Sequence, residues 1–273
     1  MLRSLVASGV DVCFGNPGTS EMHFVAALDS VEGMRPVLGL FEGVVTGAAD
    51  GYGRMAGKPA CTLLHLGPGL ANGLANLHNA RRASSPVVTI VGGHATSHSR
   101  YESPLTSDIK GFARPVSHWT HSSTSALTVG ADAARAVQAS MEAPEQIATL
   151  ILPADTAWGK ADTVAAPLPV PVPARVGDGT IEHIAALVQH GVKTAILLRG
   201  NALREEGLRA AGRIAAKTGA RLLCDTFAPR LQRGAERVPV ERLPYFAEQV
   251  GRQPRDAQAF HDRPEDSGTV EVS

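Results

Sequence analysis

Three short stretches near the N-terminus combine glycines with side chains that can exchange protons or donate hydrogen bonds. They are residues 15–21 (Gly-Asn-Pro-Gly-Thr-Ser-Glu), Glu42 directly after an apolar run, and residues 65–72 (His-Leu-Gly-Pro-Gly-Leu-Ala-Asn). A carboxylate, an imidazole and hydroxyl groups can trade protons with a bound ligand. Glycines let the backbone approach that ligand closely. Together the three stretches predict a ligand site with acid–base groups.

Each stretch also has an ordinary structural interpretation. Residues 15–21 can be a strand-to-helix turn in which Thr19 or Ser20 caps the helix. Glu42 can be a helix-start carboxylate that the helix macrodipole favours. A single histidine at a strand end, such as His65, is often structural. The combination of all three is more specific than any one of them.

The elements that must position these residues alternate between strand and helix. Apolar runs predict strands at residues 10–14, 36–40, 61–66, 86–91 and 147–152. Helical patterns occur at residues 21–28, 42–55, 70–83 and 131–141, with a turn expected at 67–69. This alternation predicts an α/β fold with a doubly wound parallel sheet over residues 1–160. Such sheets bind ligands at the carboxyl ends of their strands, where all three stretches lie.

The pattern changes after residue 160. Prolines alternate with apolar residues at Pro167, Pro169, Pro171 and Pro173, so residues 161–175 are expected to form an extended linker. Helices at 180–190 and 205–218 and strands at 194–198 and 221–224 then indicate an incomplete second α/β domain over residues 176–249. Residues 250–273 are charged and lack any hydrophobic period, so we expect a disordered tail.

Composition excludes several classes of protein. The 273 residues contain 26 basic and 26 acidic side chains, so no net positive charge exists to attract nucleic acid. No apolar run is long enough to cross a membrane, and the N-terminus lacks the pattern of a signal peptide. Three widely spaced cysteines indicate small core residues in a reducing compartment. We therefore expect a cytoplasmic protein without a membrane or nucleic-acid partner.

Three sequence motifs together carry a family resemblance. They are Asn-Pro-Gly-Thr-Ser-Glu at 16–21, Phe-Glu-Gly at 41–43 with Ala-Asp-Gly-Tyr-Gly-Arg at 49–54, and Gly-Pro-Gly-Leu-Ala-Asn at 67–72. The combination resembles the pyrimidine-binding domain of thiamine diphosphate enzymes. Acetolactate synthase large subunits and benzoylformate decarboxylase are the nearest groups. The resemblance covers about residues 1–160, and residues 175–249 look like the first half of the family's central domain.

The resemblance implies roles for particular residues. Glu42 would hydrogen-bond N1′ of the aminopyrimidine of thiamine diphosphate, and His65 would act with it in catalysis. Thr19 and His65 would lie on the substrate side. The remaining expected cofactor contacts are Asn16, Pro17, Gly18, Gly67, Gly69 and Asn72. Magnesium would bind a third domain that nothing in this sequence resembles, so we expect no metal site here. Gly177-Asp178-Gly179 imitates the start of a magnesium motif but lacks its Asn-Asn pair.

The expected activity is decarboxylation or carboligation of a 2-oxo acid, as a transferase or lyase similar to acetolactate synthase. Phe41 and His65 depart from the residues usual in acetolactate synthases, which keeps a benzoylformate decarboxylase-like lyase open as an alternative. A non-catalytic subunit of a split enzyme and a non-catalytic α/β module with another ligand are further alternatives.

The second domain ends in mid-pattern, so the sequence favours a truncated chain over a natural split. Alone, the chain is expected to bind the cofactor weakly and to be inactive. The active protein would be a homo-oligomer or would use a second chain that carries the diphosphate domain.

Overall fold

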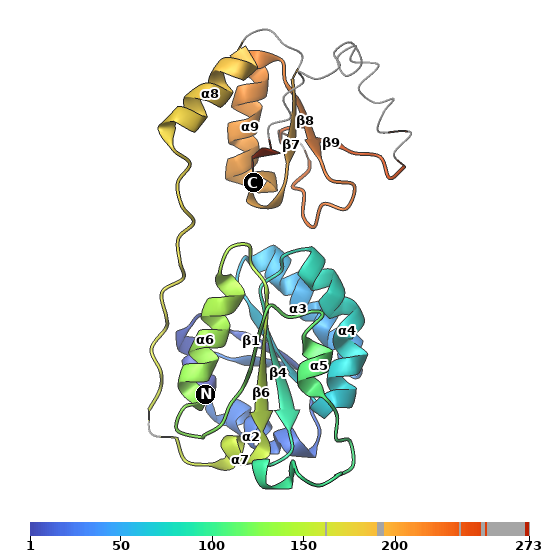
Figure 1. Ribbon diagram of the computed structural model, residues 1–273, viewed down its shortest axis with the longest axis vertical. Coiled ribbons are helices and arrows are strands. Elements are labelled where there is room, and N and C mark those ends of the chain that lie inside the picture. The colour runs from blue at the N-terminus through green and yellow to red at the C-terminus, as the bar shows by residue number, and fades with distance from the viewer. Residues whose placement is uncertain (162, 190–193, 235, 247–248, 250–270, 273) are drawn as a thin grey trace. The chain divides into compact units, whose positions relative to one another are not determined.

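The computed structural model describes residues 1–161, 163–189, 194–234, 236–246, 249 and 271–272 (Figure 1). The chain divides into two compact units, Met1–Pro173 and Ala174–Ser273. Each unit has its own sheet. No helix among the described residues is both long and apolar enough to cross a membrane.

The first unit is built on a six-stranded parallel sheet in the order β2-β1-β3-β4-β6-β5. The strands are β1 Val12–Asn16, β2 Arg35–Leu38, β3 Ala60–Leu64, β4 Val87–Gly93, β5 Trp119–Ser122 and β6 Ile147–Pro153. From β1 the chain moves outward to β2 and then returns to β3 on the other side. The strand order therefore reverses between β1 and β3, which is the switch point where such sheets bind ligands. The predicted doubly wound α/β fold is confirmed.

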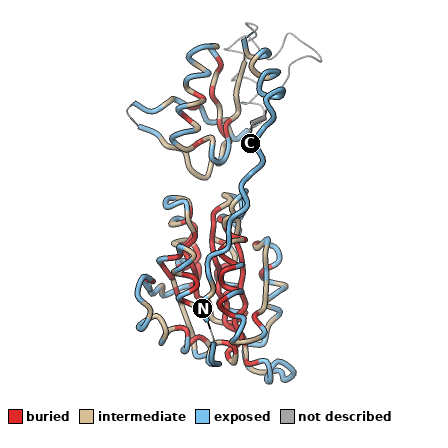
Figure 2. Tube along the Cα trace, turned by 90° about the vertical axis from the view of Figure 1, so that its left-hand side faces the viewer, coloured by how far each residue is buried: buried red, intermediate tan, exposed pale blue. Residues whose placement is uncertain are grey.

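Helices cover both faces of this sheet (Figure 1). The longer helices are α2 Met22–Ser30, α3 Glu42–Ala56, α4 Leu66–Arg82 and α6 Val129–Met141, and the shorter ones are α1 Leu2–Ala7, α5 Ile109–Ala113 and α7 Ala154–Trp158. One core cluster joins α1, α2 and α6 to the sheet, and a second joins α3, α4 and α5 to it. Because both faces are covered, every residue of β3, β4 and β6 is buried (Figure 2).

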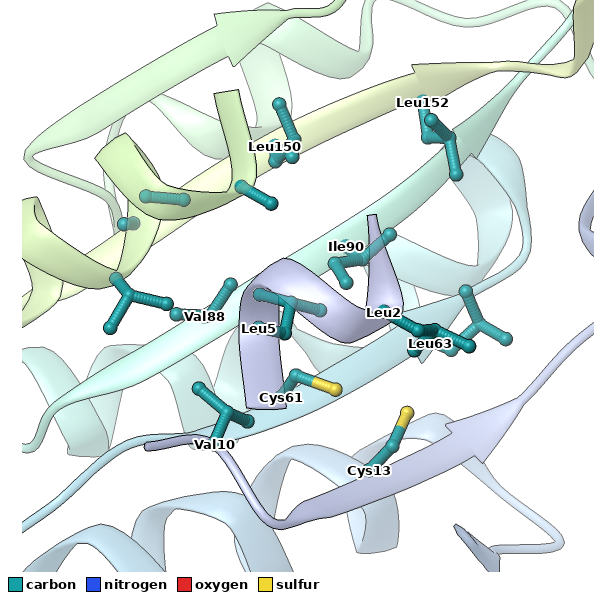
Figure 3. Packing of buried hydrophobic residues seen from close by; sticks show 14 of the residues in the cluster. Leu2, Leu5, Val10, Cys13, Cys61, Leu63, Val88, Ile90, Leu150 and Leu152 are labelled. Carbon is teal, nitrogen blue, oxygen red and sulfur yellow. The ribbon is translucent and has the colours of Figure 1, made fainter. Parts of the chain in front are cut away.

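The cluster under α1 shows why the central strands are so apolar. Leu2 and Leu5 lie over the sheet beside Leu63 and Ile90 (Figure 3). Cys13 and Cys61 are partners in neighbouring strands and are buried free thiols. Burial raises the pKa of the Cys61 thiol well above its usual value. The thiol thus stays neutral and packs as a small core side chain, in agreement with the interpretation of the cysteines.

Two boundaries differ from the sequence prediction. Strand β1 ends at Asn16, two residues later than expected, so the strand carries the chain directly to Pro17 and Gly18. Residues 67–69, predicted as a turn, belong to the first turn of α4. Pro68 is compatible with that position because the first N–H groups of a helix have no partner within the helix. The sequence also gave no sign of α1, α5, β5 or α7.

Residues 163–175 contain no helix or strand and are mostly exposed (Figure 2). Two polar contacts hold this segment to earlier residues of the first unit. Gln138 donates to the carbonyl oxygen of Pro169 at 2.6 Å, and Ser4 Oγ accepts from the backbone N–H of Ala165 at 3.0 Å.

The second unit has a smaller parallel sheet in the order β10-β7-β8-β9. Its elements are α8 Asp178–Gln189, β7 Ala195–Leu198, α9 Glu205–Thr218, β8 Arg221–Cys224, β9 Glu241–Arg242 and β10 Glu271–Val272. Helix α9 and strand β8 have the predicted bounds. The core of the unit is small and is centred on Leu198, Leu208 and Leu222. The tail predicted for residues 250–273 lies outside the described residues, except for β10.

Candidate active site at the switch point

The sheet brings the three chemical stretches to one edge. Asn16 is the last residue of β1 and pairs in register with Leu64, the last residue of β3. His65 follows immediately as the residue before α4. Glu42 is the first residue of α3. The carboxyl ends of two neighbouring strands and the N-termini of two helices therefore meet at the switch point, where helix dipoles favour negatively charged groups.

Glu42 presents one anchored and one open oxygen. The side chain is buried, and its Oε2 accepts a hydrogen bond from Asn72 Nδ2 at 3.0 Å. Oε1 takes no hydrogen bond from the described residues. An added Cβ on Gly69 would lie 3.4 Å from this oxygen, so the missing side chain at Gly69 leaves room beside it. The arrangement orients a carboxylate and leaves one of its oxygens for a ligand.

Small residues let α3 and α4 approach closely enough to make this contact. Thr46 Oγ1 contacts the Glu42 carbonyl at 2.9 Å and the Gly73 carbonyl at 3.1 Å. A Cβ on Gly73 would come within 2.8 Å of the Thr46 methyl. Asn76 adds a bond from its Nδ2 to the Gly43 carbonyl at 2.6 Å. The side chains of Thr46 and Asn76 thus hold the two helices together through bonds to backbone carbonyls, and this packing keeps Asn72 against Glu42.

A second carboxylate, Glu21, contacts His65. Glu21 Oε2 lies 2.8 Å from His65 Nδ1 and also accepts the backbone N–H of Gly18 at 2.7 Å. Glu21 is only 1% exposed. Gly18 must lack a side chain here, because an added Cβ would lie 2.4 Å from His65 Nδ1. The Asn-Pro-Gly turn thus packs against the histidine ring.

Glu21 was not among the site residues that the sequence motifs predicted. The available signal was an acid three residues after a glycine at a helix start, a spacing that lets its side chain accept the glycine N–H. That pattern normally indicates capping alone. Only the fold shows that the same carboxylate also reaches a histidine 44 residues later in the chain.

The other predicted site residues have less defined roles in the structure. Asn16 and Pro17 are half-buried and Thr19 is exposed. Among the described residues, none of the three side chains is hydrogen-bonded to Glu42 or His65. Gly67 faces the loop before α5, since an added Cβ would lie 2.2 Å from Ser107 Cβ. The packing against Ser107 explains a glycine at position 67 without a ligand.

Comparison with known proteins identifies the family. Residues 1–122 match the family described as thiamine pyrophosphate enzyme, N-terminal TPP binding domain. The chain belongs to the thiamine pyrophosphate enzyme family. IlvX of Mycobacterium tuberculosis, provisionally named an acetolactate synthase large subunit, is 56% identical over 248 residues, which are 91% of this chain and 48% of IlvX. Benzoylformate decarboxylase of Pseudomonas aeruginosa is 34% identical over 179 residues, or 65% of this chain and 30% of that enzyme.

A solved structure has the same fold as this thiamine pyrophosphate enzyme chain. The 4-hydroxybenzoylformate decarboxylase of Rhodococcus jostii aligns with a TM-score of 0.80 at 22% identity and covers 93% of this chain. The alignment spans 49% of the decarboxylase. The chain therefore corresponds to about half the length of the first relatives that it matches.

The residues at the switch point fit the aminopyrimidine of the family's cofactor. That ring needs a hydrogen-bonding carboxylate and a partly apolar surrounding. Glu42 Oε1 is open, and the preceding Leu40 and Phe41 are 89% and 51% exposed. The Phe41 ring packs over Gly43, where an added Cβ would lie 2.4 Å from it.

The Ala-Asp-Gly-Tyr-Gly-Arg stretch of the family resemblance, at residues 49–54, makes structural contacts. Asp50 is buried and accepts hydrogen bonds from Arg54 Nε at 2.8 Å and from Ser85 Oγ at 2.5 Å. A Cβ on Gly53 would lie 2.7 Å from the Pro86 carbonyl oxygen. Asp50 and Gly53 thus join α3 to the start of β4.

Replacing Ser85 by alanine should lower the free energy of unfolding by about 1–3 kcal/mol, because Asp50 would stay buried with one donor fewer. Urea denaturation of the wild type and the variant measures the difference. Ser30→Ala, at the exposed end of α2, is the control and should change stability by less than about 0.5 kcal/mol. Equal stability of Ser85→Ala and the wild type would contradict the structural role of this contact.

Proposed function

We propose that this chain supplies the aminopyrimidine side of a thiamine diphosphate-dependent enzyme acting on 2-oxo acids, similar to acetolactate synthase. The observation that carries the proposal is the Glu42 carboxylate, anchored through one oxygen by Asn72 and open at the other, at the switch point of the sheet. Membership in the thiamine pyrophosphate enzyme family and 56% identity to IlvX support it.

The residues of the chain have distinct tasks in this proposal. Glu42 Oε1 holds or releases a proton at the ring nitrogen of the aminopyrimidine, while Asn72 keeps the carboxylate in one orientation. When bound, thiamine diphosphate supplies a carbon nucleophile and an electron sink for decarboxylation. His65 exchanges protons on the substrate side. Asn16, Pro17, Gly18 and Thr19 form the turn that borders the substrate.

The diphosphate and magnesium are assigned to a domain outside this sequence. The chain spans 48% of IlvX, and among the described residues no group of three His, Cys, Asp or Glu side chains could hold a metal ion. Asp178 of the Gly-Asp-Gly stretch lies in the first turn of α8, as helix-start acids often do. We propose that a homo-oligomer or a second chain completes the site, and that the protein acts in the cytoplasm.

Titration calorimetry with thiamine diphosphate, with and without Mg²⁺, tests this division of the site. The chain alone should bind more weakly than about 10 μM, since most of the binding free energy of a diphosphate would be absent. The affinity should not depend on Mg²⁺. The chain alone should consume neither pyruvate nor benzoylformate. Tight, Mg²⁺-dependent binding would contradict the proposal that the diphosphate site lies elsewhere.

His65 and Phe41 favour one alternative, a lyase similar to benzoylformate decarboxylase. The identity of 34% to the Pseudomonas aeruginosa benzoylformate decarboxylase supports this alternative. The two candidates differ in whether a methyl or an aryl group follows the 2-oxo carbon. NMR signals of the His65 ring in the cofactor-saturated chain can separate them. If the protein is similar to acetolactate synthase, pyruvate should shift these signals. If it is similar to benzoylformate decarboxylase, benzoylformate should shift them.

A further inference from the structure

Glu21 is a buried carboxylate that contacts one of the two ring nitrogens of His65, Nδ1. Glu21 enters from the turn after β1, and His65 lies at the end of β3. The Nδ1–Oε2 distance is 2.8 Å, within normal hydrogen-bond range. The Glu21 side chain is fully buried, whereas the His65 side chain is 23% exposed. The hydrogen-bond acceptor of the pair is therefore buried, whereas the histidine ring is partly exposed at the site.

The acceptor is held in place by its surroundings. Gly18 donates its backbone N–H to the same Oε2 at 2.7 Å, so this oxygen already acts as an acceptor. On the other side, an added Cβ on Gly92 of β4 would lie 1.5 Å from Glu21 Oε1. Oε1 is buried without a hydrogen-bond partner among the described residues. A carboxylate confined in this way has little freedom to turn away from His65.

The other ring nitrogen of His65 is available. Nε2 makes no hydrogen bond with any described residue, and it is not one of the buried unpaired polar atoms. A histidine with an acceptor at Nδ1 carries its proton there, which leaves a lone pair on Nε2. We propose that Glu21 is the positioning residue for His65, fixing the proton on Nδ1 and leaving Nε2 as the nitrogen that exchanges a proton with substrate.

This inference rests on the proposed function in one respect, which is that His65 exchanges protons with the substrate. The proton balance is simple. Nε2 accepts one proton from a substrate or intermediate oxygen, the ring becomes a cation with a proton on each nitrogen, and Nε2 later returns the same proton. Glu21 keeps its charge throughout and stabilises the cation through Nδ1–H. A carboxylate that orients a histidine in this way commonly supports general acid–base catalysis.

The experiment reads the position of the ring proton directly. Long-range ¹H–¹⁵N NMR spectra of the histidine rings distinguish a protonated ring nitrogen from one with a lone pair. At about pH 8.5, where an ordinary imidazole is neutral, wild-type His65 should carry its proton on Nδ1. Glu21→Met keeps the bulk of the side chain but removes the acceptor. The ¹⁵N chemical shifts of His65, averaged over its two neutral tautomers, should then move by about half or more of the difference between a protonated ring nitrogen and one with a lone pair. Glu21→Gln keeps an acceptor oxygen and should retain the wild-type pattern.

A second buried carboxylate–histidine pair provides the matched control. His121 Nε2 lies 3.4 Å from Asp132 Oδ1 in the same unit. Asp132→Asn should leave the His65 signals unchanged, whereas a shared effect of both variants would point to a general loss of structure and would overturn the inference. A proton on Nε2 in the wild type, or an unchanged pattern in Glu21→Met, would also overturn it. If Glu21→Met does not fold, the wild-type spectrum decides.

The measurement needs no cofactor, so its failure can be told apart from failure of the proposed function. A chain that does not bind thiamine diphosphate can still show His65 protonated on Nδ1. Conversely, a chain that binds the cofactor through Glu42 can show the other tautomer, and then only the role of Glu21 is wrong.

Discussion

Glu42→Gln should weaken thiamine diphosphate binding by about 10- to 100-fold, which corresponds to the 1.5–3 kcal/mol of a hydrogen bond to a charged group. The amide keeps the size of the side chain and can still contact Asn72. It cannot provide a second negatively charged oxygen at the position of Oε1, and it cannot take up and release a proton. The change therefore removes the chemistry of the site while preserving its shape.

Calorimetry or an NMR titration of the whole chain measures this loss, with Glu32→Gln as the control. Glu32 is exposed and lies in the loop after α2, so its variant should bind like the wild type. In an enzyme completed by the diphosphate domain, Glu42→Gln should also reduce turnover by about 10²-fold or more, since proton exchange at the ring would fail. Unchanged affinity and turnover would favour a module that uses this sheet edge for another ligand.

Gly92→Ala should destabilise the first unit by about 3 kcal/mol or more, because overpacking and a lost buried hydrogen bond would act together. Gly92 lies in β4, a central strand buried along its whole length. The new methyl group would lie 1.5 Å from Glu21 Oε1. The strand is fixed by pairing on both sides, so Glu21 has to move. Its bonds to Gly18 and His65 would then break.

Gly51→Ala is the matched control for urea denaturation. Gly51 lies in α3, and an added Cβ there meets no atom within 4 Å. That variant should be as stable as the wild type or about 0.5–1 kcal/mol more stable, because alanine favours the helix. The double variant Gly92→Ala with Glu21→Ala should regain part of the loss, since truncation of Glu21 removes the collision. A Gly92→Ala protein of wild-type stability would disprove the close contact between β4 and Glu21.

The sequence predicted those parts of the fold whose pattern is local. The apolar run at 86–91 corresponds to β4, and the helical period at 205–218 corresponds to α9 with the same bounds. Their signals arise from burial that repeats along one segment, so no knowledge of distant residues is needed. The short β5 was missed because it is an edge strand with a polar, half-buried sequence. Its position depends on pairing with β6.

The site residues also separate into those that local sequence motifs predicted and those contacts that depend on the tertiary structure. The sequence motifs indicated the family through their resemblance to thiamine diphosphate enzymes, and that resemblance selected Glu42, His65, Gly69 and Asn72. The close packing of α3 and α4, through Thr46 and Gly73, is what brings Asn72 to Glu42 across 30 residues of chain.

The partner of His65 could be found only in the tertiary structure. Glu21 and His65 are 44 residues apart, and Gly92, which confines the carboxylate, lies on a third segment. Residue types and local period thus determined the fold class, and the resemblance carried by the motifs indicated the family and the candidate reactive groups. The pairing of those groups depended on the strand order β1-β3-β4, because that order places residues that are distant in sequence within hydrogen-bond distance.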